Sequence, residues 1–327
     1  MTAAIERFDA PLSGAAVVGG ALRGMLRARP DEAVLPPRLL QREVMLEAEA
    51  VAAYADLCGF APEQGVPITW PHILAFPLQM RLMLGADFPY PAVGLVHLHN
   101  RIRQQARLNL GDRLTLTARA GRFLAHDKGQ AFTLETTAAR DGVTVWEGVS
   151  VYLRLGRPGR GDPAPVLTGE EADRLIETWT VPADLGRRYA RVSGDANPIH
   201  TSALGARLFG FRRAIAHGMW TKAQATAALS PPAPLDAAEV EVAFRAPLFL
   251  PGQVGLYVGP ADDIRDFEVR DAAGARAHLR GRLTLSPEDS VACGPLLRRA
   301  GSPFSAAIAV LWRGRTPPMP RPPIRRC

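Results

Sequence analysis

Hydrophobic and polar positions alternate along several stretches of the chain, and apolar positions recur at helical spacing along others. Alternation is typical of half-buried strands, and a period near 3.6 residues is typical of helices. The pattern predicts helices over residues 48–57, 73–84, 184–192, 201–209 and 218–229. It predicts strands over residues 39–47, 94–106, 113–125, 130–140, 144–155, 175–181, 239–246, 253–260, 264–271 and 276–286. Turn residues between the strands indicate antiparallel neighbours.

The order of these elements repeats along the chain. In each half a short strand leads into helices, and a run of strands follows. Residues 54–59 align with residues 189–194, and residues 108–111 align with residues 249–252. Self-similarity at a fixed offset is the mark of a duplicated unit. We therefore predict an α+β fold made of two copies of one unit, each a long helix wrapped by an antiparallel sheet.

Composition divides the chain into four segments. Residues 1–36 form a lead-in rich in Ala, Gly and Pro, residues 37–157 form the first repeat, and residues 158–290 form the second. The Gly- and Pro-rich stretch 156–165 is predicted to link the repeats, with nothing apolar to pack. Arg and Pro dominate residues 291–327, and such a composition cannot build a core, so we expect a disordered tail.

Charge and cysteine content exclude several classes of protein. The net charge of +7 equals the seven arginines of residues 291–327, so residues 1–290 are neutral. No basic stripe with interleaved aromatics indicates a nucleic-acid partner. The three cysteines are dispersed, which favours a reducing compartment, and no apolar run approaches the roughly 18–20 residues that span a membrane. A cytoplasmic protein is expected.

A dense polar cluster lies between two of the predicted helices, at Asp195, Asn197, Pro198 and His200. Proline fixes its own φ and pushes the preceding residue toward extended geometry, while Asn bonds its own backbone, so the chain turns here. The turn brings an acid and an imidazole together. Such a pair suits one water molecule, with Asp195 accepting its proton and His200 positioning it or carrying a second transfer. A helix cap is the alternative role for Asp195.

Gly218 lies where the chain enters the predicted helix 218–229. Its N–H has no partner within the helix, and a carbonyl oxygen resting there would be polarised as in an oxyanion hole. These parts suit addition or elimination of water beside a thioester carbonyl. His217 is either a supporting residue of this site or a structural residue at the helix entry. Asp195 and His200 find no obvious third ligand, so no metal is expected.

Three segments, YARVSGDANPIH, GFRRAIAHGM and FRAPLFLPGQ, resemble the MaoC-like family of (R)-specific enoyl-CoA hydratases, also called hydratase 2, in its two-repeat form. The specific motif covers about 65 residues of the second half, and the order of elements extends the resemblance over residues 37–290. The resemblance implies a double hot-dog fold and reversible hydration of trans-2-enoyl-CoA to (R)-3-hydroxyacyl-CoA. It also implies that Asp195 and His200 activate water, that Gly218 stabilises the oxyanion, and that Asn197 supports the loop. No cofactor is implied, because coenzyme A is part of the substrate.

The first repeat lacks an acid and an imidazole at the matching positions, residues 57–60, and is expected to be catalytically silent. In two-repeat relatives such a half covers the acyl chain. Four large side chains are candidates to line that tunnel, with ordinary core packing as the alternative: Trp70, Phe76, Met80 and Met83. Arg245 is a candidate contact for the substrate's phosphates. We interpret the histidines of the predicted strands, His97, His99 and His126, as structural.

Other functions fit the same fold. The chain would then be a thioesterase, a dehydratase acting on carrier-protein substrates, or a non-catalytic acyl-CoA binding subunit. Because two fused repeats already form the pair that single-repeat relatives need two chains for, a homodimer is possible but not required.

Overall fold

The computed structural model describes residues 4–9, 33–260 and 264–286, together with Ala16, Gly19, Gly20, Arg23, Gly24 and Leu26. The tail expected over residues 291–327 and most of the lead-in expected over residues 1–36 lie outside the described residues. One described part of the lead-in, β1 (Ile5–Arg7), pairs in parallel with β2 (Leu39–Met45). This part of the lead-in therefore belongs to the sheet.

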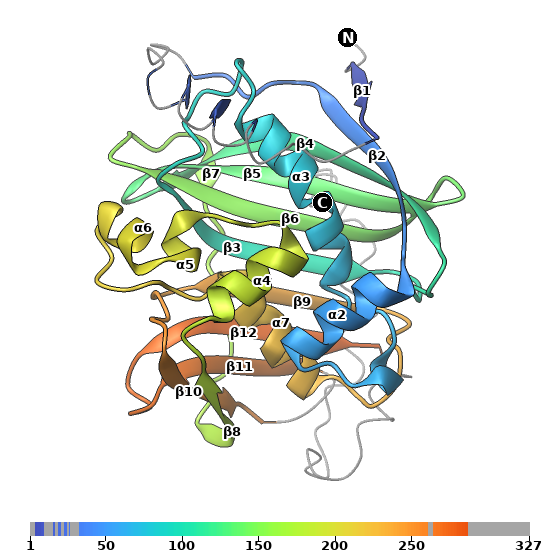
Figure 1. Ribbon diagram of the computed structural model, residues 1–327, viewed down its shortest axis with the longest axis vertical. Coiled ribbons are helices and arrows are strands. Elements are labelled where there is room, and N and C mark those ends of the chain that lie inside the picture. The colour runs from blue at the N-terminus through green and yellow to red at the C-terminus, as the bar shows by residue number, and fades with distance from the viewer. Residues whose placement is uncertain are drawn as a thin grey trace, which may run out of the picture.

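In the described residues, the strands form a 12-stranded sheet with the order β1-β2-β4-β5-β6-β3-β9-β12-β11-β10-β8, to which β7 adds beside β4 (Figure 1). The remaining strands are β3 (Leu95–Gln104), β4 (Arg113–His126), β5 (Gly129–Arg140), β6 (Val143–Leu155), β7 (Asp162–Pro163), β8 (Arg174–Val181), β9 (Ala238–Phe244), β10 (Gly252–Val258), β11 (Ile264–Asp271) and β12 (Ala277–Leu285). The long ladders are antiparallel, as the turn residues predict. The strands lie within a few residues of their predicted positions.

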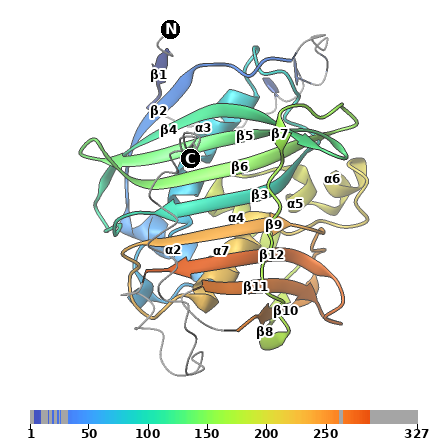
Figure 2. The ribbon, with the colours of Figure 1, turned by 180° about the vertical axis from the view of Figure 1, so that it is seen from behind.

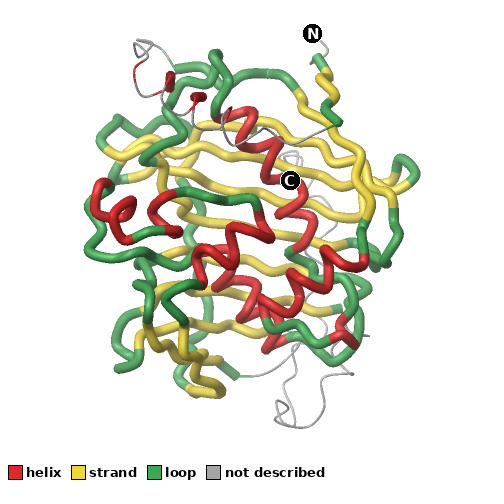
Figure 3. Tube along the Cα trace, viewed as in Figure 1, coloured by secondary structure: helices red, strands yellow, loops and turns green. Residues whose placement is uncertain are grey.

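Helices cover one face of this sheet, as Figures 1 and 3 show. They are α2 (Ala48–Cys58), the 3-10 turn η1 (Pro62–Gln64), α3 (Trp70–Met83), α4 (Leu185–Ser193), α5 (Pro198–Thr201), α6 (Ala203–Leu208) and α7 (Gly218–Leu229). α7 is rich in alanine and buried on nearly all sides, so it lies close against the strands. None of the described helices combines the length and hydrophobicity needed to cross a membrane.

Two helices differ from the prediction. α3 begins at Trp70 rather than Ile73, because Pro71 fits the first turn of a helix, where its missing N–H costs nothing. The single helix predicted over residues 201–209 is replaced by α5 and α6. Ser202 separates them, since its backbone is extended and its hydroxyl accepts a hydrogen bond from the N–H of Gly205.

The aligned residues of the two halves occupy equivalent positions. Gly59 ends α2 and Gly194 ends α4, each in the left-handed region with φ of 75°, which glycine adopts without steric cost. The aligned rings of Tyr54 and Tyr189 are both buried, and their centroids lie 6.3 Å apart. We propose the same division into two repeats, after residue 157, that the sequence predicts.

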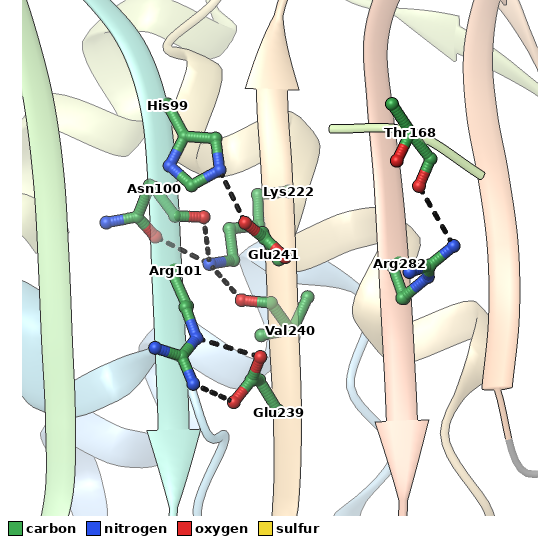
Figure 4. A network of polar contacts seen from close by, with 9 residues as sticks. All are labelled: His99, Asn100, Arg101, Thr168, Lys222, Glu239, Val240, Glu241 and Arg282. Atoms are coloured by element: carbon green, nitrogen blue, oxygen red, sulfur yellow. Dashed lines mark hydrogen bonds and ion pairs between the residues drawn. The ribbon is translucent and has the colours of Figure 1, made fainter. Parts of the chain in front are cut away.

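The halves meet where β3 pairs with β9 in an antiparallel ladder. One ion pair and one histidine–carboxylate contact join side chains of these two strands (Figure 4). Arg101 donates two hydrogen bonds to Glu239, at 2.8 and 2.7 Å, and Nε2 of His99 lies 2.8 Å from a carboxylate oxygen of Glu241. The sheet therefore continues from one half into the other.

Lys222 of α7 reaches the same ladder from the helical face (Figure 4). This side chain is fully buried, and its Nζ donates to the backbone carbonyl and side-chain oxygen of Asn100 on β3 and to the carbonyl of Val240 on β9. Three acceptors match the three hydrogens of an ammonium group. Burial lowers the pKa of Lys222 well below its ordinary value, while Glu241 and Glu239 oppose that shift. One side chain thus ties both halves to α7.

The segment between the repeats is not a free linker. Residues 156–174 run along the outer face of the sheet (Figure 2), and β7 pairs with residues Leu124 and Ala125 of β4. Leu167 and Ala172 of this segment are buried, with 5% and 1% of their surfaces exposed. The prediction that nothing in 156–165 packs is wrong, because backbone pairing with a strand needs no apolar side chain.

Candidate active site

The predicted motif forms a tight turn between α4 and α5. Asn197 caps α5, since its side-chain oxygen lies 3.3 Å from the N–H of Ile199, and Pro198 follows at the first helical position. The backbone N–H of Asn197 donates to Oδ1 of Asp195 at 3.2 Å. The side chain of Asp195 is 28% exposed. Asn197 therefore orders the loop that carries the carboxylate.

His200 is the next functional side chain and lies in α5. Its Nδ1 lies 2.9 Å from the carbonyl oxygen of Ile215, which requires the ring hydrogen on Nδ1 and leaves the lone pair on Nε2. Burial lowers the pKa of His200, while Asp195 and the bond to Ile215 oppose that shift. Gly186 of α4 permits this placement, because a Cβ there would collide with the carbonyl oxygen of His200. The ring is therefore a neutral base in a fixed orientation.

His217 precedes α7 and joins the motif through space. Its Nε2 lies 3.0 Å from the carbonyl oxygen of Asp195 and 3.8 Å from Oδ2 of the same residue. Its ring stacks on that of His200, with centroids 3.8 Å apart. Burial, and then the neighbouring His200, lower its pKa to about 3. The structure thus places His217 beside both proposed catalytic residues.

Gly218 is the first residue of α7, so its N–H points out of the positive end of the helix. A Cβ at this position would lie 2.7 Å from the ring of Phe244, at the end of β9. Only a glycine lets the ring lie against the helix start.

Side chains of the first half, which the sequence did not assign to the site, face the motif. His72 of α3 is 3% exposed, and the ring of His97 on β3 lies between Tyr152 and Phe244, at 4.6 and 4.8 Å. The Asp195 charge acts on the pKa of both His72 and Tyr152, which places them near the motif. Simple alternation along β3 would put His97 and His99 on the same side of the sheet, so the sequence does not indicate that His97 faces the motif. The register shifts between the two residues, and their rings therefore meet different neighbours.

The candidate tunnel residues have mixed positions. Trp70 and Met83 belong to the core, Met80 packs against it, and Phe76 is half-buried. Arg245 is exposed just after β9. Trp70 also lines an open hollow of about 670 Å³ between α2 and α4, together with Arg191. In the described part of the chain, no hydrogen bond or ring contact joins any of these five predicted residues to Asp195 or His200.

The expectation that Asp195 and His200 lack a third metal ligand is wrong in geometry. Among the described residues, one donor atom each from Asp195, His200 and His217 lie within 4.8 Å of one another. Nδ1 of His200 and Nε2 of His217 donate to carbonyls, so the lone pairs of the two rings lie on Nε2 of His200 and Nδ1 of His217. These two nitrogens stay available as bases or as metal ligands.

Comparisons with known proteins agree with the family resemblance of the sequence. The family model of the MaoC-like domain matches residues 166–271. The 3-hydroxyacyl-thioester dehydratase X of Mycobacterium tuberculosis is 35% identical over 263 residues, which cover 79% of this chain and 93% of that protein.

Solved structures extend the likeness to the fold. The crystal structure of HtdX from Mycobacterium tuberculosis matches with a TM-score of 0.66 and 32% identity, over 76% of this chain and 100% of that chain. A MaoC-like dehydratase from Phytophthora capsici matches with a TM-score of 0.65 at 16% identity, over 77% of this chain and 96% of that chain, and shows the fold alone. The expected hot-dog fold and family resemblance are confirmed: this chain belongs to the MaoC-like dehydratase family and is an enzyme of the hydro-lyase class.

Proposed function

We propose that the chain catalyses the reversible hydration of trans-2-enoyl thioesters to (R)-3-hydroxyacyl thioesters. The carrying observation is the placement of one carboxylate, Asp195, and one neutral imidazole, His200, on a single turn beside the start of α7. The relative whose name is 3-hydroxyacyl-thioester dehydratase supports the substrate class. The (R) configuration and coenzyme A as the thioester carrier rest on the resemblance of the motif to hydratase 2.

The water chemistry follows from the two side chains. A water between the carboxylate of Asp195 and Nε2 of His200 donates a hydrogen bond to each. As its oxygen bonds to C3 of the enoyl group, one of these two groups takes the proton that the water loses. The same group then delivers this proton to C2 on the same face, which gives syn addition and returns both residues to their starting states. General acid–base help of this kind contributes about 10²–10⁴-fold.

The electrons displaced from the double bond move toward the thioester oxygen. The N–H of Gly218 stabilises the charge that develops there, because it is a helix-start donor with no partner inside the helix. His217 acts through its neighbours: it holds the backbone of Asp195 and stacks on His200. The scheme routes no step through a metal or redox cofactor. A cytoplasmic setting, as expected, accords with a coenzyme A substrate.

The test compares D195N and H200A with two matched controls, D184N and H278A. Asp184 precedes α4 without capping it through its side chain, and His278 lies on β12. We expect D195N and H200A each to lower the hydration rate of crotonyl-CoA by at least about 10²-fold, and the controls to keep it. Full activity in either motif variant, with the wild-type fold by circular dichroism, would overturn the assignment.

The same assay separates the alternative functions. The hydration product should be oxidised by an (R)-specific, and not by an (S)-specific, 3-hydroxyacyl-CoA dehydrogenase. Release of free coenzyme A from 3-hydroxyacyl-CoA, without enoyl product, would indicate a thioesterase. Turnover of carrier-protein thioesters alone would indicate a carrier-protein dehydratase. Tight acyl-CoA binding without turnover of any thioester would indicate a binding subunit.

A further inference from the structure

Two histidines of the first half lie side by side, and each has one buried ring nitrogen without a hydrogen-bond partner among the described residues. The rings of His72 and His97 are nearly parallel, at 16°, with centroids 6.5 Å apart. Nδ1 of His72 and Nε2 of His97 are enclosed, and neither finds a partner among the described residues. Buried polar atoms are normally paired, so each of these two nitrogens calls for a hydrogen-bond partner from a ligand or a water molecule.

Packing fixes the ring of His97 in this place. Tyr152 stacks on one side of it at 4.6 Å and 16°, and Phe244 contacts it at 4.8 Å. Tyr152 itself interacts with Ser150 through its hydroxyl. The irregularity in β3 between His97 and His99 gives the two rings different neighbours, since His99 pairs with Glu241 while His97 faces His72. Bulges re-aim side chains in this way, frequently beside active sites.

The pair adjoins the proposed reaction centre. Phe244 contacts His97 and also covers Gly218, the residue that we assign to the oxyanion. The charge of Asp195 acts on the pKa of His72. His97 as a whole is partly exposed, although its Nε2 is enclosed. An acyl chain bound with its thioester at Gly218 and leading past Phe244 into the first half would reach these rings.

Both imidazoles are uncharged. Burial lowers the pKa of His72 to about 3, and it lowers the pKa of His97 well below the ordinary value, with Lys222 adding to both shifts. A neutral imidazole offers one donor and one acceptor nitrogen. Such a pair matches an uncharged oxygen group, which accepts or both accepts and donates, better than it matches a carboxylate, which would favour protonated rings.

We propose that His72 and His97 form a hydrogen-bonding subsite for an uncharged oxygen substituent, a hydroxyl or keto group, on the acyl chain of the substrate. The preferred substrates are then oxygenated enoyl thioesters rather than plain ones. This inference rests on the proposed function and narrows its substrate class. One well-placed hydrogen bond, together with relief of the unpaired nitrogens, predicts a preference of about tenfold or more.

The wild-type enzyme provides the first test. kcat/KM is measured for a plain trans-2-enoyl-CoA and for a series in which one hydroxyl or keto group occupies successive positions beyond C3. Dissociation constants of the matching saturated acyl-CoA ligands, which do not react, are measured in parallel. We expect at least one position to be preferred about tenfold or more over the plain chain in both measurements. Equal values at every position would overturn the inference and assign the two nitrogens to bound water.

Variants locate the preference. H97F keeps a flat ring beside Tyr152 and Phe244 but removes the ring nitrogens of His97, and H72L removes the ring nitrogens of His72. In each variant the kcat/KM of the preferred oxygenated substrate should come close to that of the plain substrate. H278F, on β12, should keep the wild-type ratio. A preference that persists in folded H97F and H72L would overturn the inference.

A second measurement needs no variant. In ¹⁵N spectra of histidine-labelled wild-type protein, the preferred saturated oxygenated ligand should shift ring nitrogens of two histidines that the plain ligand leaves in place; unshifted nitrogens would overturn the inference. The two proposals fail separately. Absence of turnover for every enoyl thioester would refute the proposed function, whereas the binding and ¹⁵N measurements would still decide the subsite.

Discussion

The imidazole rings of His200 and His217 stack with their centroids 3.8 Å apart, and each donates its ring hydrogen to a different backbone carbonyl. His200 donates to the carbonyl of Ile215, which precedes α7 in the sequence, and His217 donates to the carbonyl of Asp195, which follows α4. The two rings therefore cross-link the motif loop to the start of α7. This arrangement fixes the tautomer of His200 and holds Asp195 beside it, which a proton-transfer site requires.

Deletion of the Gly218 N–H should slow the chemistry while the helix persists. Proline is tolerated at the first helical position, and the backbone of His217, at φ −66° and ψ 131°, already suits a following proline. Because Phe244 would clash, we compare G218P/F244A with G218A/F244A, which keeps the N–H. We expect kcat of the proline variant to be about 10²–10³-fold lower than that of the alanine variant. Equal kcat values would exclude this N–H from the oxyanion site.

The buried histidines should make stability fall in acid. The pKa of His72 and that of His217 are each lowered to about 3, from an unfolded value of about 6.5. Between the folded and the unfolded pKa, the unfolded state binds a proton that the folded state does not. The free energy of unfolding therefore decreases as the pH decreases, by about 1.4 kcal/mol per pH unit per histidine. The free energy of unfolding is measured in urea from about pH 7 to about pH 4. Its dependence on pH should be weaker in H217F by the contribution of one histidine, and it should be unchanged in H126F. An unchanged slope in H217F would contradict the assignment.

Replacement of Lys222 should weaken the junction of the two halves. K222M removes the buried donor to the oxygens of Asn100 and Val240, and we expect a loss of about 2–4 kcal/mol in the free energy of unfolding. R101M removes a more exposed ion pair with Glu239 and should cost less than about 1 kcal/mol. Denaturant unfolding of both variants measures the two losses of unfolding free energy. Similar losses would show that Lys222 contributes no more to the junction than the Arg101–Glu239 pair does.

Chelation should leave activity intact. Asp195, His200 and His217 lie close enough to ligate an ion, but the proposed reaction needs only a carboxylate, a neutral imidazole and a water molecule. After dialysis against EDTA, kcat should stay within about twofold of its starting value. A loss that added zinc restores would assign a metal to these three residues instead.

Local signals made the motif region predictable. Asn197 and Pro198 specify a capped turn, and the start of α7 at Gly218 coincides with the predicted boundary. The strands after each helix follow from alternation and turn residues. Such features depend on neighbours within a few residues, so one sequence carries them.

Long-range features were not predictable from these patterns. Nothing near His72 in the sequence shows that it meets His97, and the irregularity of β3 reverses the side that simple alternation gives His97. His217 stacks on His200 only because the chain between them folds back, with Ile215 bonded to Ile199. The pairing of β3 with β9 likewise depends on tertiary packing.

The continuity of the sheet across β3 and β9 has an evolutionary consequence. In a symmetric pair of identical chains every mutation appears twice, so a change that improves substrate binding in one copy also alters the catalytic copy. Fusion of two copies in one polypeptide removes that constraint. Under the proposed division into two repeats, the first half would then be free to carry side chains such as His72 and His97 in place of an acid and an imidazole, while the second half carries the proposed reaction.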